Sequence, residues 1–228
     1  MKARTFAIRA AISRNRTAAS LVPLTVEQVQ AISDAVPGRY RARVLASAGL
    51  GLRQGDACGL TVDRVDFLRR QVRVDRQLVT PPGAGPVRFG PPKATSSNRV
   101  FTLPDSVGEV LAAHIAQFGT GADGLLFTSS TGAALRRSTW SDAFRRAARD
   151  VGVDASSNDL RHHCASLLIS AGCSVKVVQS FLGHKNASET LDTYGHMWPG
   201  DEDGFVPRAT QGCEGMCAEC ARTLWSTA

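Results

Sequence analysis

The sequence predicts a mainly helical α+β domain with a small three-stranded antiparallel sheet. Segments before residue 50 and after residue 104 repeat apolar residues every three or four positions, which is typical of amphipathic helices. Between these segments, three short stretches alternate apolar and polar residues, which is typical of half-buried strands. With 228 residues, 43% of them hydrophobic, the chain is long enough to bury the core of one large domain.

The first two helices are expected at 25–36 and 38–50. Thr25 and Gln28 have the spacing of a capping box, which indicates that the first helix begins at Thr25. The glycines around Leu50 end the second helix, because glycine readily adopts the backbone conformation that closes a helix.

The three strands are expected in "VDRVDF", "QVRVDRQLV" and "NRVFTLP". A short "LRRQ" segment joins the first two strands tightly. Residues 80–97 are rich in Pro, Gly and Ser, and this composition predicts a long loop between the second and third strands.

The chain after the sheet returns to a helical pattern. Residues 104–118 form one expected helix, which runs to Gly119, and Ser138 is the expected cap of the next one. Residues 158–172 place a row of apolar residues on one face. Two shorter helices, "SVKVVQSFLG" and "ASETLDTY", complete the helical region.

Charge and composition favour a polyanionic partner. The chain has 27 basic and 20 acidic residues and a net charge of +7, which suits nucleic acid. No apolar run approaches the roughly 20 residues that cross a bilayer, and the basic N-terminal residues lack the apolar core of a secretory signal. We therefore expect a cytoplasmic protein that contacts no membrane.

The six cysteines do not predict a metal site. Three of them, Cys58, Cys164 and Cys173, lie in apolar helical contexts and are most simply small core residues. The other three cluster in the C-terminal tail, one ligand short of the usual four for structural zinc: Cys213, Cys217 and Cys220. We expect neither zinc nor another cofactor.

Three motifs occur in a fixed order along the chain: "GLGLRQGDACGLTVDRVDF", "NDLRHHCASLLISAG" and "LGHKNASETLDTYGH". Together they resemble the catalytic domain of the tyrosine recombinases, the phage integrase family, over residues 23–198. The resemblance implies the recombinase catalytic-domain fold and double-stranded DNA as the partner. It also implies DNA cleavage and rejoining through a 3′-phosphotyrosine intermediate, as in site-specific integration of a mobile element.

The resemblance implies a role for each of five residues. Tyr194 matches the nucleophile, and a phenolate can hold a phosphate covalently and later release it. Arg53 and Arg161 match the two arginines that hold phosphate oxygens. His184 matches a histidine that donates to the phosphate, and Lys93 matches a lysine that protonates the departing 5′-hydroxyl. No metal or nucleotide is required.

Two supporting positions complete the expected site. Asp56 lies where the family often has an acidic residue that orients its neighbours. Asn158 replaces the family's usual histidine, and an amide cannot accept the tyrosine's proton at neutral pH. Catalysis is therefore expected to be slowed by Asn158 and not abolished. If Asn158 does not slow it, then His162, His163 or the arginine field already activates Tyr194.

The ends of the chain depart from the family pattern. Residues 1–22 are expected to be a linker or the remnant of an N-terminal DNA-binding domain. Residues 199–228 are expected to be a divergent tail of irregular structure, which bears on the assembly of a homo-oligomer on DNA. Each site residue also has an ordinary structural interpretation, such as a helix cap or a core aromatic. Alternatives are thus a non-catalytic DNA-binding remnant of an integrase or, less well supported, an enzyme of the type IB topoisomerase style.

Overall fold

The structure, a computed structural model, describes residues 22–79, 87–92 and 97–198. The α-helices in this part are α1 (Val26–Ala35), α2 (Gly38–Leu50), α3 (Gln54–Cys58), α4 (Asp105–Phe118), α5 (Arg137–Asp150), α6 (Asp159–Ser170), α7 (Val175–Leu182) and α8 (Ala187–Tyr194). The strands are β1 (Val65–Asp66), β2 (Gln71–Val74), β3 (Gln77–Val79), β4 (Arg88–Gly90) and β5 (Arg99–Thr102).

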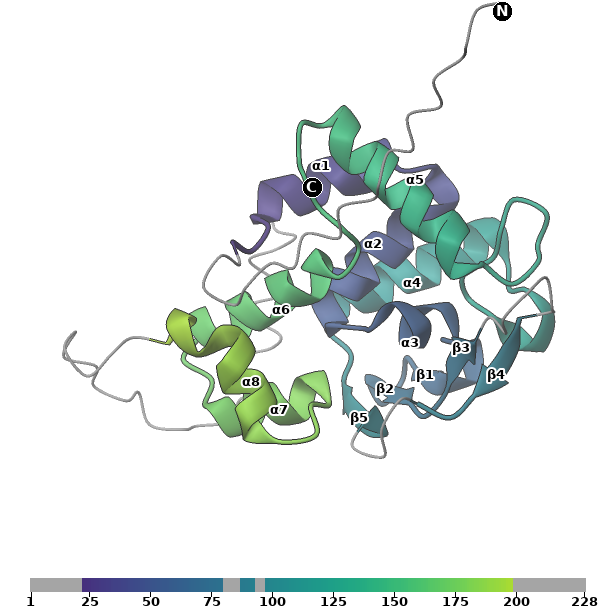
Figure 1. Ribbon diagram of the computed structural model, residues 1–228. Helices are drawn as coiled ribbons and strands as arrows, with labels where there is room; N and C mark the ends of the chain where they lie inside the picture. The colour runs from purple at the N-terminus through teal and green to yellow at the C-terminus, as the bar shows by residue number, and fades with distance from the viewer. Residues whose placement is uncertain (1–21, 80–86, 93–96, 199–228) are drawn as a thin grey trace, which may run out of the picture.

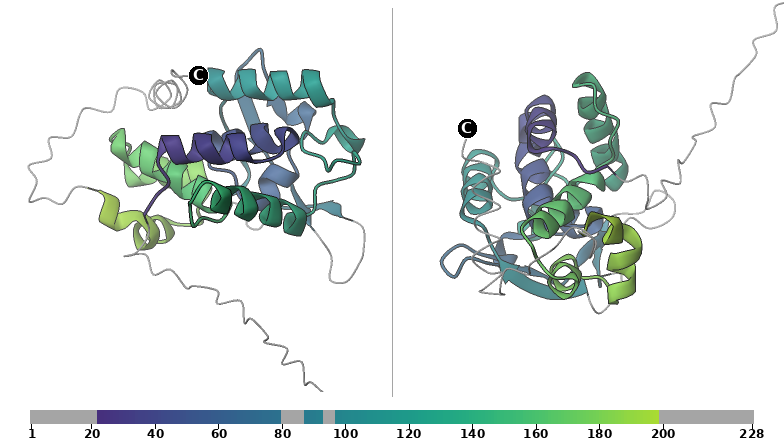
Figure 2. Two further views of the ribbon diagram at one scale, coloured as in Figure 1. Left: turned by 90° about the horizontal axis from the view of Figure 1, so that it is seen from above. Right: turned by 90° about the vertical axis from the view of Figure 1, so that its left-hand side faces the viewer.

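Helix α2 is the central element of the helical part. It packs against α1, α4 and α6, and Figure 2 shows α1 and α2 between α4 on one side and α5 on the other. Almost all of its residues from Tyr40 to Leu50 are buried, so α2 contributes to two core clusters at once. The sheets lie at one side of this helical layer, and α6 to α8 form a separate group beside β5 (Figure 1).

The predicted helix boundaries are confirmed where capping chemistry was visible in the sequence. The Thr25 side chain accepts from the Gln28 backbone while the Gln28 side chain accepts from the Thr25 backbone, so the capping box is complete. Helix α2 ends at Gly51, whose φ of 57° lies in the left-handed region. The cap of α5, in contrast, is Arg136 and not Ser138, because the Trp140 N–H already donates to the Arg136 carbonyl.

The predicted three-stranded antiparallel sheet is present, in the order β1–β2–β5. Val72 of β2 faces Val65 on one side and Phe101 on the other, which buries the apolar alternation that predicted these strands. Strand β5, the third strand of this sheet along the chain, pairs with β2, although a long connection separates the two in the sequence.

The prediction of one continuous strand over residues 71–79 is wrong. Strand β2 ends at Val74, and Asp75 then pairs with Arg64 at 2.8 Å as the chain leaves the first sheet. The following residues form β3, which pairs with β4 in a second, two-stranded sheet. Strand β4 lies in the segment expected to be a loop, because Phe89 faces Leu78 across this pair and packs on its cluster.

Helices α6, α7 and α8 share a third core cluster, which includes Tyr194. Cys164 and Cys173 are buried in the same cluster as free thiols, as the sequence predicts. Phe181 of α7 contacts Phe101 of β5, with ring centroids 5.2 Å apart, and this contact ties the cluster to the edge of the first sheet. Within the described residues, no helix is long and apolar enough to cross a membrane.

Candidate active site

Four elements bring the candidate site residues together. Arg53 is the N-cap residue of α3, Arg161 lies in the first turn of α6, and Tyr194 is the last residue of α8. His184 follows Gly183, the residue that caps the end of α7. Lys93, the expected general acid, falls outside the described residues.

Arg161 is held by the end of α2. The side chain is 4% exposed, and its NH1 donates to the Gly51 carbonyl at 2.7 Å. Gly51 needs its left-handed conformation to aim this carbonyl, and a Cβ there would lie 2.9 Å from Leu182. NH2 of Arg161 is buried and makes no hydrogen bond within the described part of the chain. Burial, followed by repulsion from Arg53 and Arg99, lowers the pKa of Arg161 to about 10, so it remains charged at neutral pH.

Arg53 links the sheet to the turn that carries His184. Its NH1 donates to Ser97 Oγ at 2.9 Å, and its NH2 donates to the Gly183 carbonyl at 2.8 Å. Gly183 has a φ of 69°, which an L side chain adopts only with strain. The arginine is thus fixed from both sides while remaining partly exposed.

Arg99 is a third arginine at the site, and the sequence interpretation did not include it. Its NH1 lies 3.5 Å from Oδ2 of the buried Asp56, and Nε and NH2 have no hydrogen-bond partner in the described residues. Burial lowers the pKa of Arg99, while Asp56 acts in the opposite direction. Asp56 thus lies beside Arg99 as its ion-pair partner, and its expected role in orienting a neighbour stays a prediction. A sequence signal was available only in the placement of a charged residue at the start of an otherwise apolar strand.

His184 is buried between α7 and α8. Its Nδ1 lies 2.8 Å from Thr190 Oγ1, and its ring stacks on Tyr194 with centroids 6.2 Å apart and planes 9° apart. Burial, reinforced by the charge of Arg161, lowers the pKa of His184 to about 4. The ring is therefore neutral at neutral pH and can donate one hydrogen bond and accept another.

Tyr194 is 1% exposed, and its hydroxyl lies 2.8 Å from Nδ1 of His162. Burial raises the pKa of Tyr194 to about 12, although the charge of Arg161 acts to lower it. In the protein without DNA, the phenol is therefore protonated at neutral pH.

Asn158 reaches the site through His162. Its Nδ2 lies 2.8 Å from Nε2 of that histidine, whose other nitrogen faces Tyr194. The sequence interpretation treated Asn158 as a residue that cannot accept the tyrosine's proton, and His162 as one of several alternatives for activating Tyr194. The signal for the contact was the spacing of four residues, which places both side chains on one face of a helix.

The charges at the site do not balance. Three guanidinium groups meet one carboxylate, Asp56, and two of the three, Arg99 and Arg161, carry buried donors without partners in the described residues. Such an arrangement is costly unless an anion accepts these hydrogen bonds. Its shape and charge suit a phosphate group, which arginine forks hold through two oxygens.

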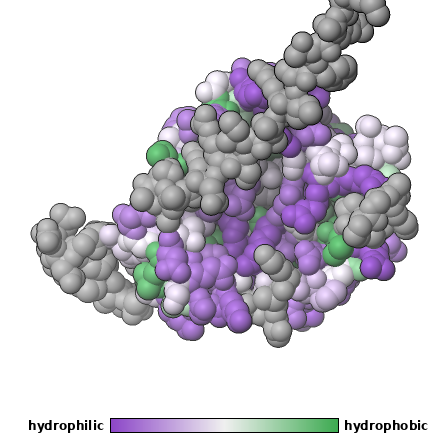
Figure 3. All heavy atoms as spheres, viewed as in Figure 1, coloured by the Kyte–Doolittle hydropathy of each residue, from purple (hydrophilic) through white to green (hydrophobic). Residues whose placement is uncertain are grey.

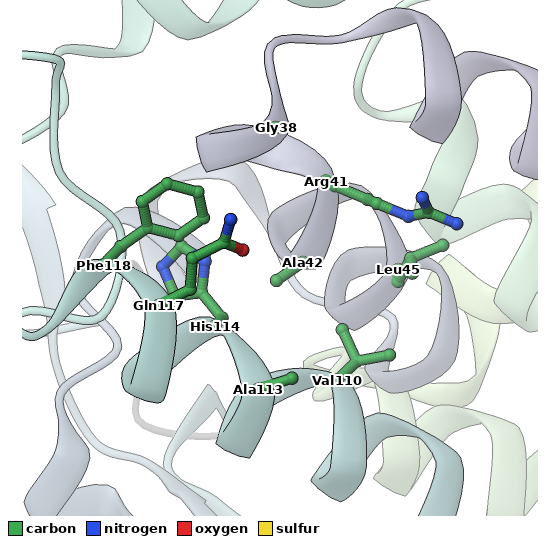
Figure 4. Close-up of a pocket in the computed structure, with 9 residues that line it drawn as sticks. All are labelled: Gly38, Arg41, Ala42, Leu45, Val110, Ala113, His114, Gln117 and Phe118. Atoms are coloured by element: carbon green, nitrogen blue, oxygen red, sulfur yellow. The ribbon is translucent and has the colours of Figure 1, made fainter.

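A separate hollow of about 150 Å³ lies between α2 and α4 (Figure 4). His114 and Phe118 close one end of it, and Leu45 and Val110 lie toward the other. The His114 ring is fixed, because Nε2 lies 2.9 Å from the Leu126 carbonyl and the ring packs on Phe118. This hollow contains none of the candidate site residues, and several of the residues that line it, such as Arg41 and Gln117, are exposed. In the described residues, no group of three His, Cys, Asp or Glu side chains is placed to hold a metal ion.

Comparison with known proteins identifies relatives of the chain. The chain is 27% identical over 201 residues to a XerC-like tyrosine recombinase of Caldanaerobacter subterraneus, a match that covers 79% of this chain and 51% of the relative. It is 28% identical over 172 residues to the tyrosine recombinase XerA of Thermococcus kodakarensis, with coverage of 73% and 55%. The chain thus spans about half the length of the curated relatives it matches.

Solved structures show the same fold. A Tn1549 transposon integrase, determined in complex with transposon right end DNA, superposes with a TM-score of 0.70 at 25% identity, over 80% of this chain and 64% of that one. A crystal structure of a XerA recombinase gives a TM-score of 0.61 at 19% identity, over 80% of this chain and 60% of that one.

The family model of the phage integrase family matches residues 23–199, which include Arg53, Arg161, His184 and Tyr194. This match covers well over half of the chain, and its limits enclose every element of the described structure. The chain therefore belongs to the phage integrase family.

Proposed function

We propose that this chain is a site-specific DNA recombinase that cleaves and rejoins strands through a 3′-phosphotyrosine link on Tyr194. The observation that carries the proposal is the position of this tyrosine beside a cluster of arginines with unpaired donors. A buried phenol with no catalytic partner would be only a core aromatic. Beside a site for a phosphate group, it is a nucleophile.

Arg53 and Arg161 hold the non-bridging oxygens of the scissile phosphate in this proposal. The partly exposed Arg53 meets the phosphate first, and NH2 of Arg161 supplies a donor that has no partner in the described structure. Their charges also stabilise the extra negative charge of the transition state, an effect worth about 10²–10³ in rate for one well-placed donor. The neutral His184 donates one more hydrogen bond, with Thr190 bound to its other nitrogen.

Cleavage begins when Tyr194 Oη attacks the phosphorus atom. The bond between phosphorus and Oη forms, the bond to the 5′-oxygen breaks, and that oxygen takes a proton. We assign the donor of this proton to Lys93, which matches the lysine that acts as general acid in the family. In rejoining, a 5′-hydroxyl attacks the phosphotyrosine and the same steps run in reverse.

Double-stranded DNA is the proposed partner. We assign the catalytic domain to residues 23–198, with the flanking segments 1–22 and 199–228 outside it. The face seen in Figure 3 is largely hydrophilic among the described residues, as expected of a surface that meets a phosphate backbone. The solved Tn1549 integrase was determined with DNA, and we propose that this chain acts on DNA in the cytoplasm, as a homo-oligomer.

Trapping a covalent adduct tests this function. The full chain is incubated with a pool of randomised DNA duplexes, each nicked near its centre so that cleavage releases a short fragment and cannot be reversed. We expect an adduct that resists denaturing electrophoresis, and none from Tyr194→Phe, which retains the ring and the fold. DNA retention without an adduct in either protein would contradict recombination and favour the binding-only alternative.

A further inference from the structure

A chain of two hydrogen bonds runs from the start of α6 to the end of α8. Nδ2 of Asn158 lies 2.8 Å from Nε2 of His162, and Nδ1 of the same ring lies 2.8 Å from Tyr194 Oη. The rings of His162 and Tyr194 also meet edge to face, with centroids 5.6 Å apart. The proposed function above gives no role to His162.

The chemistry of the amide decides where the histidine carries its hydrogen. An asparagine Nδ2 has hydrogens to donate and no lone pair to accept with. Nε2 of His162 must therefore be the acceptor, and a neutral imidazole with a lone pair on Nε2 carries its hydrogen on Nδ1. The bond to the nucleophile then runs from Nδ1–H of His162 to Oη of Tyr194.

We infer that His162 is a catalytic residue that stabilises the phenolate of Tyr194 by donating Nδ1–H to it, and that Asn158 is the positioning residue that fixes this tautomer. The inference deepens the proposed function and rests on it. Asn158 is then no poor substitute for a histidine at the phosphate. It makes the adjacent histidine a donor and prevents it from acting as a base.

The path of the tyrosine's proton follows from this tautomer. Because Nδ1 of His162 already holds a hydrogen, it cannot receive the proton of Oη, which passes to water or hydroxide as the bond to phosphorus forms. Other ionisable groups act on the phenol from each neighbouring element, and none of them is a base in hydrogen-bond contact with Oη in the described structure: Arg161 and Cys164 of α6, Arg53 before α3, Glu189 of α8, and the stacked His184.

The tautomer can be observed without DNA. Long-range proton–nitrogen correlation NMR distinguishes a ring nitrogen that carries hydrogen from one that does not, and His162→Phe identifies the signals of His162 among the five histidines. We expect hydrogen on Nδ1 and a lone pair on Nε2. In Asn158→Asp, a carboxylate accepts from Nε2–H, so the hydrogen should move to Nε2. Asn98→Asp, the same change at an exposed position, should leave the signals of His162 unchanged.

The rate of adduct formation gives the catalytic test. Without a general base, the rate in the full chain should rise about tenfold per pH unit between about pH 6 and 9, because the proton leaves to hydroxide. Asn158→Asp frees Nδ1 to accept the proton and should flatten this profile, whereas a purely structural role would lower the rate equally at every pH.

The two measurements separate this inference from the proposed function. Hydrogen on Nε2 of the unaltered protein, or a profile that is already flat, would overturn the inference even if adducts form. If the NMR result is as expected and no adduct forms under any condition, the proposed function fails, and with it the catalytic role of His162.

Discussion

Two regions of the molecule bury arginine, and they do so in different ways. In the helical core, Arg43 is 0% exposed, and its guanidinium lies 4.3 Å from the centre of the Trp140 ring. Its NH2 donates to the Gln54 carbonyl at 3.2 Å and its NH1 lies 3.1 Å from the Cys58 sulfur. One charge is thus surrounded by an aromatic face and weak acceptors. Its Nε also has no hydrogen-bond partner in the described residues, but repulsion from another arginine, Arg137, is the smallest influence on its pKa.

At the candidate active site, three arginines are brought within range of one another. Arg53 and Arg99 each repel the positive charge of Arg161, and the carboxylate of Asp56 is the negative charge beside them. Packing would not select this arrangement, because like charges in a buried site repel and their unpaired donors lose water. The difference indicates that Arg43 stabilises the fold, whereas the cluster of three arginines costs stability unless an anion binds there.

We expect the largest effect at Arg161, where a substitution tests whether the cluster serves catalysis or stability. Arg161→Met keeps similar volume and removes the charge, and it should slow covalent adduct formation by about 10²–10³, the effect of losing one transition-state donor. The thermal midpoint should change little, because the loss of the hydrogen bond to the Gly51 carbonyl is offset by removal of a buried charge among like charges. A large fall in the midpoint, measured by calorimetry, would show that Arg161 is structural.

Acid should destabilise the site through His184. Its folded pKa of about 4 lies below the ordinary 6.5, so between these values the unfolded chain binds a proton that the folded chain does not. The contribution is complete above about pH 6.5 and is lost as the pH falls toward 4, by at most about a few kcal/mol in the free energy of unfolding.

Denaturant unfolding at several pH values measures this loss, and His184→Phe should reduce its slope. The buried His114 and His163 also have lowered pKa values because of burial, so they supply the slope that remains in this variant. An unchanged slope would mean that His184 is already protonated or exposed in the folded chain.

Arg43→Met tests the other half of the comparison. The variant loses the contact with Trp140 and leaves the Gln54 carbonyl without its buried donor, and these losses are offset in part by the absence of a desolvated charge. We expect a net loss of about 2 kcal/mol in the free energy of unfolding. Adduct formation at a temperature where the variant is folded should change less than tenfold. A rate loss as large as that of Arg161→Met would erase the distinction between the two regions.

The sequence predicted the fold where local chemistry determines it. The capping box at Thr25 and the glycine after Leu50 fix helix ends through backbone contacts a few residues apart, and both predictions are confirmed. The second sheet was missed because the pairing of Leu78 with Phe89 depends on a contact between residues eleven positions apart, which no periodicity reveals.

The candidate site shows the same limit. Motif resemblance selected Arg161, His184 and Tyr194 because each lies in a recognisable short pattern, and the structure brings these three together. Their catalytic roles stay predictions. Arg99 and the link from Asn158 through His162 to the nucleophile depend on side-chain directions between separate elements. Lys93 lies outside the described residues, so its assignment rests on the resemblance.

We expect the smallest effect at Ser97, where a substitution tests whether a hydrogen bond to Arg53 serves the site or the fold. This buried serine accepts a hydrogen bond from Arg53 NH1 at 2.9 Å, and it stands four positions after Lys93, so it ties the end of the lysine-bearing segment to the first arginine.

Ser97→Ala removes one hydrogen bond worth about 1 kcal/mol. If Ser97 serves the site, that loss should appear in the adduct rate, as a reduction of about fivefold, because Arg53 becomes free to adopt other rotamers. If it serves only the fold, the free energy of unfolding should fall by the same amount and the rate should not change. Thr193→Ala is the control for a change next to Tyr194 that does not involve the arginines, since it also deletes one hydroxyl bond, from Thr193 Oγ1 to the Glu189 carbonyl at 2.8 Å. An equal loss of rate in both variants would show that the effect is general destabilisation and that Ser97 does not position Arg53.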